Sequence, residues 1–139
     1  MKLQFRINKP YQTVFEYLID VEKFSSVHPV INKIDHLHTN HYLVHETLRV
    51  AFIPFSFTYP VTIDYSLENK EINMKAVVMK LTTIEMNFKL SSENNLTIVD
   101  EEIIFKSPLP IRSMLEKTFQ KQHKLLFENI EHKDFEPEH

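Results

Sequence analysis

Two glutamates are the first candidates for chemistry, because both fall in phase with apolar residues in stretches that alternate like β-strands. Glu46 shares the parity of Val44, and Glu101 shares that of Ile103. An isolated ionised carboxylate in an apolar interior is costly, so it usually shifts its pKa or finds a partner. Two inward glutamates could supply a general acid and base, or they could orient the polar end of a ligand. The ordinary alternative is that each one reaches water at a strand end or pairs with an arginine or lysine.

Imidazoles are the second chemical resource, and half of them crowd one expected hairpin. With a turn at 39–40, four histidines project from one face, and two of them oppose each other across the strands: His36, His38, His41 and His45, with His38 opposite His41. Such spacing can ligate zinc, nickel or copper. That face carries few apolar residues and no evident carboxylate to support the ligands. We therefore interpret it as the solvent side of a sheet and predict neither a metal site nor a cofactor.

Of the four histidines outside this hairpin, two are candidates for a role in the fold or the site. His28, which precedes Pro29, could hydrogen-bond a ligand or shuttle a proton, although a capping or surface role is the ordinary alternative. His123 borders the apolar stripe of an expected C-terminal helix, and we predict a structural role for it. The catalytic candidates are thus Glu46, Glu101 and His28. Whether the chain is an enzyme stays open, with a binding role favoured.

The composition removes several other chemistries. The 139 residues contain no cysteine, which excludes disulfides, thiolate metal sites and a cysteine nucleophile. They contain no glycine either, so the dinucleotide fingerprint, the Walker loop and the G-x-S-x-G nucleophile elbow are absent. A net charge of −3 gives no attraction to a polyanion, and we predict no nucleic-acid partner.

Length and hydropathy indicate a single cytoplasmic domain. With 42% hydrophobic and 25% charged residues, the chain suits one folded domain over 1–139, with a polar tail that frays from about residue 133. No apolar run reaches the roughly eighteen residues that a membrane span needs. The first residues alternate rather than form a signal peptide, which predicts a cytoplasmic location.

Hydrophobic periodicity predicts the elements that must position these side chains. Residues 2–7 alternate like a half-buried strand. A helix opened by Pro10 and a short helix capped by Asp20 follow, and Pro29 ends the second. Six strands with a period of 2 are then expected at 30–37, 42–50, 55–67, 72–79, 83–91 and 96–106.

The last stretch, 110–132, is again helical, and only a helix of this length can cover a sheet of six or seven strands. Its apolar stripe includes Ile111, Met114, Phe119 and Leu126. A sheet curved around this helix is the economical arrangement.

Two turns test the strand pattern. Two-residue turns are expected at Asn94-Asn95 and Asn69-Lys70. The first places Phe88 opposite Glu101, and the second places Tyr65 opposite Met74. In both hairpins one face is then almost wholly apolar, which indicates an antiparallel sheet with one covered face.

The inward face of this meander is rich in aromatic and methionine side chains. Such soft, bulky residues suit a pliable apolar pocket, but they suit a closed core equally well, and the sequence leaves both open. Gln122 on the inward stripe of the last helix favours a cavity, because a dry core would leave its amide unpaired. The apolar segment 51–55 is a pocket lid, a partner contact or a loop that packs down.

The order of these elements resembles a known superfamily, as do several segments near the N-terminus. They are a strand ending in Asn8-Lys9-Pro10, a helix with Val14-Phe15-Glu16-Tyr17-Leu18, and the segment from Asp20-Val21 through Lys23-Phe24 to Val30. Over essentially its whole length the chain resembles the SRPBCC superfamily, which comprises START domains, birch-pollen-allergen-like proteins and polyketide cyclase or dehydrase relatives. It departs from them in lacking glycine at hairpins and a tryptophan near the second short helix, where Val27-His28 stands instead.

The resemblance implies an α+β helix-grip fold, in which a curved antiparallel sheet of six or seven strands holds the long C-terminal helix around an internal cavity. It implies binding of a small, mainly apolar ligand such as a lipid, a sterol or a polyketide-like molecule. The alternatives are a cyclase or dehydratase that uses the inward carboxylates, and a domain that binds a protein partner through the loop 52–55. The expected ligand-binding residues are Phe24, His28, Glu46, Leu48, Phe57, Tyr59, Met74, Met86, Phe88, Glu101, Phe119 and Gln122.

Overall fold

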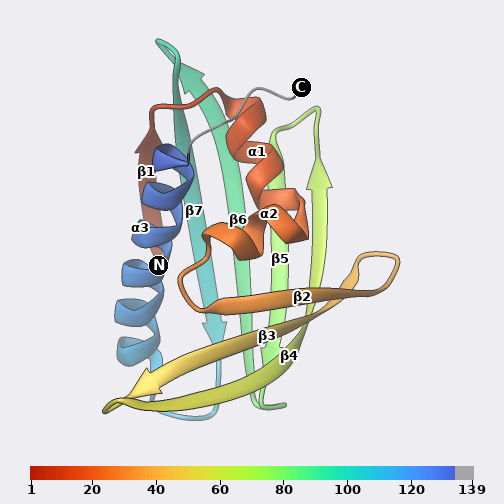
Figure 1. The fold of residues 1–139 in the computed structure, drawn as a ribbon, viewed down its shortest axis with the longest axis vertical. Coiled ribbons are helices and arrows are strands. Elements are labelled where there is room, and N and C mark those ends of the chain that lie inside the picture. Colours follow the sequence, from red (N-terminus) through yellow and green to blue (C-terminus); the bar gives the residue numbers. More distant parts are fainter. Residues whose placement is uncertain (134–139) are drawn as a thin grey trace.

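The computed structural model describes residues 1–133 and contains one seven-stranded antiparallel sheet and three helices (Figure 1). The elements are β1 (Lys2–Ile7), α1 (Tyr11–Ile19), α2 (Val21–Val27), β2 (Ile31–His38), β3 (His41–Val50), β4 (Ile53–Ser66), β5 (Glu71–Val78), β6 (Thr82–Glu93), β7 (Leu96–Lys106) and α3 (Arg112–His132). This architecture confirms the predicted fold class, with seven strands. The predicted frayed tail lies, apart from Lys133, outside the described residues.

The sheet is a meander with one added strand. Its order is β1-β7-β6-β5-β4-β3-β2, so consecutive strands from β2 to β7 are neighbours and β1 pairs with β7. Figure 1 shows β2 and β3 crossing the direction of β5, β6 and β7, so the sheet curls into a concave face. The helices α1, α2 and α3 lie on that face, as a sheet with one apolar side requires.

Local sequence explains the two short helices. The Asp20 side chain accepts hydrogen bonds from the backbone N–H groups of Glu22 and Lys23, at 3.0 and 3.1 Å, and so caps α2. Helix α2 ends at Val27 and His28 follows it with extended backbone angles, because Pro29 disfavours helical angles at the residue before it. This tight ending directs the His28 side chain from the end of α2 toward the start of β2.

The core lies between the concave face and the helices. The buried residues of α3 are His123, Leu126, Phe127 and Ile130, all in its second half. Phe127 packs on Phe5 of β1, with ring centroids 4.6 Å apart. The sequence placed Met114 on the inward stripe, but Met114 is 58% exposed. It sits in the first turn of α3, ahead of the half that the core covers.

One predicted strand register is confirmed and one is wrong. Across the β6–β7 turn, Phe88 opposes Glu101 as predicted. Across the β4–β5 turn, Tyr65 opposes Ile72 and not Met74. The connection there runs over four residues, 67–70, rather than two, which slides the register by two positions. A shift of two keeps every side chain on its predicted face, because side chains alternate with a period of two.

The turns reach left-handed backbone angles without glycine. Eight described residues have a positive φ: Thr39, Ala51, Phe52, Lys70, Met79, Lys80, Asn94 and Asn95. Asparagine tolerates this region better than other non-glycine residues, which explains the pair at the β6–β7 turn. Among the residues from 1 to 133, no helix is long and apolar enough to cross a membrane.

Candidate functional site

A cavity of about 230 Å³ lies inside the fold, between the concave face of the sheet and α3. Strands β2 to β6 supply most of its wall, α3 closes one side, and Phe24 and His28 close another. Aliphatic, aromatic and methionine side chains dominate the lining. The polar side chains among them are His28, Glu46, Tyr59, Thr118, Gln122 and His123. An apolar hollow with a few convergent polar groups is the usual form of a small-molecule site.

Glu46 is the first polar group of the cavity. It lies on β3 next to β4, and its Oε1 accepts a hydrogen bond of 2.7 Å from the Tyr59 hydroxyl. Only 8% of Glu46 is exposed, so the carboxylate has lost most of its water. Burial raises the pKa of Glu46, and the hydrogen bond from Tyr59 offsets part of that rise. Burial, and then the neighbouring carboxylate, raise the pKa of Tyr59 well above its ordinary value, which keeps the phenol a donor.

His28 is the second polar group of the cavity. Its Nδ1 accepts hydrogen bonds from the backbone N–H groups of Val30 and Ile31, at 3.2 and 3.3 Å. Loss of solvent around the ring, and then the nearby His123, lower the pKa of His28 to about 3. The ring is therefore neutral at pH 7, with its proton on Nε2. It offers the cavity an N–H donor and no charge.

The third polar feature is a buried pair, in which His123 lines the cavity and Glu101 lies behind it. His123 Nδ1 on α3 lies 2.8 Å from Oε1 and 2.7 Å from Oε2 of Glu101 on β7. The hydrogen bond is directed at Oε1, and Oε2 has no other partner in the described part of the chain. Both residues are 2% exposed. Since Nδ1 is engaged, Nε2 is the ring nitrogen of His123 left to act as an acceptor.

The structure brings most of the predicted binding residues to one cavity. Ten of the twelve line it: Phe24, His28, Glu46, Leu48, Phe57, Tyr59, Met74, Met86, Phe119 and Gln122. Phe88 and Glu101 do not. Both point inward, but the His123 ring stands next to them, in a stacked arrangement with Phe88 at 6.2 Å and hydrogen-bonded to Glu101. Whether the ten bind a ligand stays a prediction.

Sequence reasoning missed His123 as part of the lining. The signal was available, since His123 follows Phe119 by four residues and precedes Leu126 by three, which places it on the inward face of a helix. The partners of the two glutamates were also missed. Neither pairs with an arginine or lysine in the described structure; Tyr59 and His123 take those places.

The histidine-rich hairpin keeps the predicted pairing only at its turn, where His38 opposes His41 with ring centroids 4.5 Å apart. A register shift between His36 and His38 places His36 opposite Tyr42, whose ring it contacts. His36 therefore shares the face of Tyr42 and not that of His41 and His45, so the prediction of four histidines on one face is wrong. The sequence showed no carboxylate near these rings, yet Asp35 accepts a hydrogen bond of 2.7 Å from His45. Between residues 1 and 133, no three His, Asp or Glu side chains are grouped closely enough to hold a metal ion.

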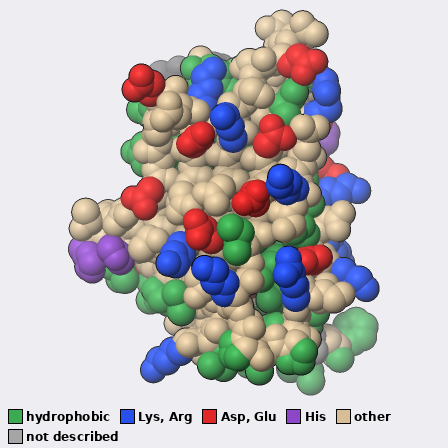
Figure 2. Space-filling model, turned by 180° about the vertical axis from the view of Figure 1, so that it is seen from behind, with side chains coloured by type: hydrophobic (Ala, Val, Ile, Leu, Met, Phe, Trp, Pro, Cys, Tyr) green, Lys and Arg blue, Asp and Glu red, His purple; other side chains and the backbone are tan. Residues whose placement is uncertain are grey.

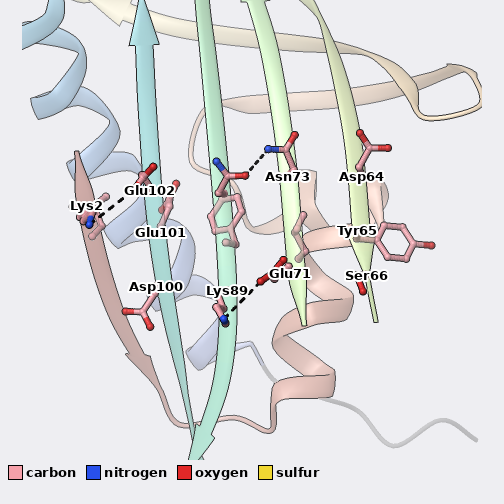
Figure 3. A pocket seen from close by; sticks show the side chains of 14 residues that line it. Lys2, Asp64, Tyr65, Ser66, Glu71, Asn73, Lys89, Asp100, Glu101 and Glu102 are labelled. Carbon is pink, nitrogen blue, oxygen red and sulfur yellow. Dashed lines mark hydrogen bonds and ion pairs between the residues drawn. The ribbon is translucent and has the colours of Figure 1, made fainter. Parts of the chain in front are cut away.

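A second hollow, of about 700 Å³, lies on the opposite face of the sheet (Figure 3). It runs over β1, β7, β6, β5 and β4 and is open to solvent. Its charged side chains largely pair with each other, Lys2 with Glu102 at 4.0 Å and Lys89 with Glu71 at 3.7 Å. Asp64 and Asp100 accept hydrogen bonds from Asn40 and Gln4, so most charged side chains of this broad hollow are already engaged on the surface of the sheet. The interior cavity is therefore the candidate site.

Comparison with known proteins supports the fold and no closer relationship. No protein-family model matches the chain, and no curated protein matches its sequence. Three solved structures illustrate the likeness. A START superfamily protein from Mycobacterium smegmatis has a TM-score of 0.72 and 16% identity, over 94% of this chain and 93% of the other. Ara h 8.0201 has a TM-score of 0.74 and 13% identity, over 94% and 93%.

The third is the Zhui aromatase/cyclase from Streptomyces sp. R1128, with a TM-score of 0.65 and 14% identity over 94% of this chain and 89% of the other. At such identities the likeness concerns the fold. It confirms the helix-grip fold that the resemblance to the SRPBCC superfamily implies.

Proposed function

We propose that this chain, which has the helix-grip fold of the SRPBCC superfamily, binds a small, mainly apolar ligand in the cavity between its sheet and α3. The observation that supports the proposal is the cavity itself, with its apolar wall and its few polar side chains. Apolar side chains that fail to meet across a hollow lose packing contacts, and a bound apolar molecule restores them.

The volume limits the size of the ligand. An apolar cavity of about 150 Å³ admits benzene. A cavity of about 230 Å³ then suits a molecule of roughly ten non-hydrogen atoms, such as a fused bicyclic aromatic compound, by the same proportion. A sterol or a long fatty acid is larger than this space and would require the cavity to expand.

The polar side chains of the cavity define the chemistry of the ligand's polar end. Tyr59 engages Oε1 of Glu46, which leaves Oε2 to accept from a ligand hydroxyl. His28 offers a neutral N–H to a ligand oxygen. An aromatic alcohol therefore matches the cavity better than the unsubstituted hydrocarbon, because a buried polar group left without a partner is costly.

The test is a binding panel read by thermal shift and by titration calorimetry. It compares 2-naphthol, naphthalene, stearic acid and cholesterol. We expect 2-naphthol to raise the melting temperature most, since a ligand at 100 times its Kd adds about 2.7 kcal/mol to the free energy of unfolding. Failure of the whole panel to bind would contradict the proposal.

Matched variants locate the binding. Ala76 lines the cavity and is 3% exposed, so Ala76→Leu fills the space. Thr58 lies exposed on the same sheet, and Thr58→Leu adds bulk outside the cavity. We expect A76L to lose binding and T58L to retain it. Equal binding by both variants would place the ligand elsewhere.

The Glu101–His123 pair favours a second candidate function, proton transfer on the bound ligand. Nε2 of His123 would remove a proton from the carbon next to a ligand carbonyl, and the electrons of that C–H bond would form an enolate. The N–H of His28 would donate to the enolate oxygen, and the proton would return to carbon, so no further reagent is needed. Enolisation is the step that cyclases and dehydratases acting on ketones share.

The experiment is hydrogen exchange of 2-tetralone in deuterated water, followed by NMR. Accelerated exchange that His123→Gln abolishes and His38→Gln retains would support this function. Exchange at the rate of the buffer alone would exclude it for this ketone and leave binding as the function.

A further inference from the structure

One end of the molecule differs from the rest in charge and in exposed apolar surface. Strands β3, β5 and β7 run in the same direction in the antiparallel sheet, so the connections that follow them lie at the same end of the sheet. We call it the β3–β4 end; it comprises residues 49–55, 78–82 and 106–114. In Figure 1 it is the lower end of the molecule.

Large apolar side chains project from this end into solvent. Phe52 is 95% exposed and Ile53 69%, at the tip of the β3–β4 turn. Met79 at 60%, Leu81 at 53%, Leu109 at 47% and Met114 at 58% project from the two neighbouring connections. Seen from behind in Figure 2, hydrophobic side chains gather at the lower end of the molecule. Contiguous exposed apolar surface on a folded protein marks an interaction site.

The charges of this end have one sign. The three stretches contain Arg49, Lys80, Lys106 and Arg112, and they contain no aspartate or glutamate. The acidic residue that follows, Glu116, forms an ion pair of 3.0 Å with Arg112. The chain as a whole carries a net charge of −3. In Figure 2 the acidic side chains lie over the upper and middle parts of the face. A chain that is acidic overall thus presents a basic end.

We propose that the β3–β4 end docks on the surface of an anionic phospholipid bilayer, with Phe52 and Ile53 inserted among the lipids and the four basic side chains at the headgroups. Peripheral membrane binding combines these two elements, apolar side chains in the interface and basic side chains at anionic headgroups. Separate tips on three connections enter a fluid interface without a matching set of hollows, which a protein partner would have to provide.

The same end borders the candidate cavity. Met79 and Phe55 are exposed there, and both also line the cavity. Docking at this end would bring part of the cavity wall to the lipid, where apolar ligands partition. The docking itself does not depend on ligand binding, and the two are measured separately.

The experiment is co-sedimentation of the full chain with phosphatidylcholine vesicles that contain either no anionic lipid or roughly 30% phosphatidylglycerol, whose negative surface potential attracts basic side chains. We expect binding to the anionic vesicles alone. Adding 0.5 M salt should weaken it, because the Debye length is then about 4 Å and attraction between charges farther apart is largely screened. Absence of binding to anionic vesicles, or equal binding to neutral ones, would overturn the proposal.

Two variants and two controls locate the contact. Phe52→Ser/Ile53→Ser removes the tips, and Lys80→Glu/Lys106→Glu reverses the charge; each Lys or Arg near an anionic surface contributes about fivefold to the partition coefficient. The controls are Leu67→Ser and Lys75→Glu. Leu67 is 68% exposed in the β4–β5 connection, at the opposite end of the strands, and Lys75 is exposed on the outer face of the sheet. We expect both variants to lose at least tenfold in partitioning and both controls to bind normally.

Circular dichroism confirms that each protein is folded, and sedimentation velocity measures self-association. Vesicle binding that the F52S/I53S variant retains would overturn the proposal. So would a dimer without vesicle binding that this variant dissociates, because the patch would then serve a second copy of the chain.

Discussion

Glu101 of β7 and His123 of α3 are joined by a hydrogen bond of 2.8 Å at a point where each residue is 2% exposed. The bond ties the C-terminal helix to β7, the strand next to the edge strand β1. It also sets the orientation of the His123 ring, which forms part of the cavity wall. Phe88 and Phe119 pack around that ring, at centroid distances of 6.2 and 5.4 Å.

This pair predicts strongly non-additive mutations. His123→Leu leaves a carboxylate buried without its partner, and we expect it to lower the free energy of unfolding by about 3–5 kcal/mol. Replacing both residues, as E101L/H123L, removes the polar groups together and should cost less than H123L alone. Urea unfolding of the wild type, Glu101→Leu, H123L and E101L/H123L checks this. Losses that simply add would contradict a coupled pair.

The Glu46–Tyr59 hydrogen bond predicts the effect of a single hydroxyl. Tyr59→Phe removes the donor and leaves the carboxylate of Glu46 with less of its polar environment, so we expect a loss of about 1–3 kcal/mol at pH 7. It should also raise the pKa of Glu46 further, because Tyr59 lowers it. Urea unfolding gives the first quantity. Tyr65→Phe, at a tyrosine that is 54% exposed, is the control and should change little.

His28 predicts a loss of stability in acid. The folded state binds the His28 proton at a pKa of about 3 and the unfolded chain at about 6.5. Between these values the unfolded chain binds more protons, so the free energy of unfolding falls as the pH is lowered, by up to about 1.4 kcal/mol per pH unit. The contribution is complete above pH 6.5 and decreases toward pH 3.

The measurement is urea unfolding from pH 7.5 to 4 for the wild type and for His28→Gln, with His38→Gln as the control. Glu46 acts in the opposite sense, because its raised pKa removes stability as the pH rises above the ordinary range of a glutamate. The difference between wild type and H28Q isolates His28. A pH slope that H28Q leaves unchanged would contradict this assignment.

Met74 predicts a trade between stability and ligand size. Its side chain is 2% exposed and lines the cavity, so Met74→Ala enlarges the space and should cost about 2–5 kcal/mol. The enlarged cavity should bind a three-ring aromatic alcohol that the wild type excludes. Calorimetry with 2-naphthol and a hydroxyanthracene measures the shift. If M74A kept the ligand preference of the wild type, Met74 would not limit the cavity.

The sequence predicted faces better than it predicted pairings. Alternation depends on side-chain geometry alone, so Glu46 and Glu101 point inward as predicted. The β4–β5 register failed because nothing in 67–70 distinguishes a turn of two residues from one of four. Both lengths put the same residues on the covered face.

The partners of the buried polar groups were beyond prediction for a related reason. Tyr59 contacts Glu46 because of the register between β3 and β4. His123 contacts Glu101 because of the position of α3 along β7. Helical periodicity states which way His123 points but not where along the sheet it lies. The hollow between the sheet and α3 depends on the same spacing, which explains why a packed core and a cavity looked equivalent in the sequence.

The absence of glycine leaves this protein with unused thermostability. Among residues 1–133, six left-handed positions carry side chains other than asparagine: Thr39, Ala51, Phe52, Lys70, Met79 and Lys80. A Cβ in this conformation costs on the order of 1 kcal/mol, which glycine would avoid. Replacing several of these residues by glycine should therefore raise the melting temperature. Four of these residues, Ala51, Phe52, Met79 and Lys80, lie exposed at the β3–β4 end, where an apolar or basic side chain has a use that glycine cannot supply.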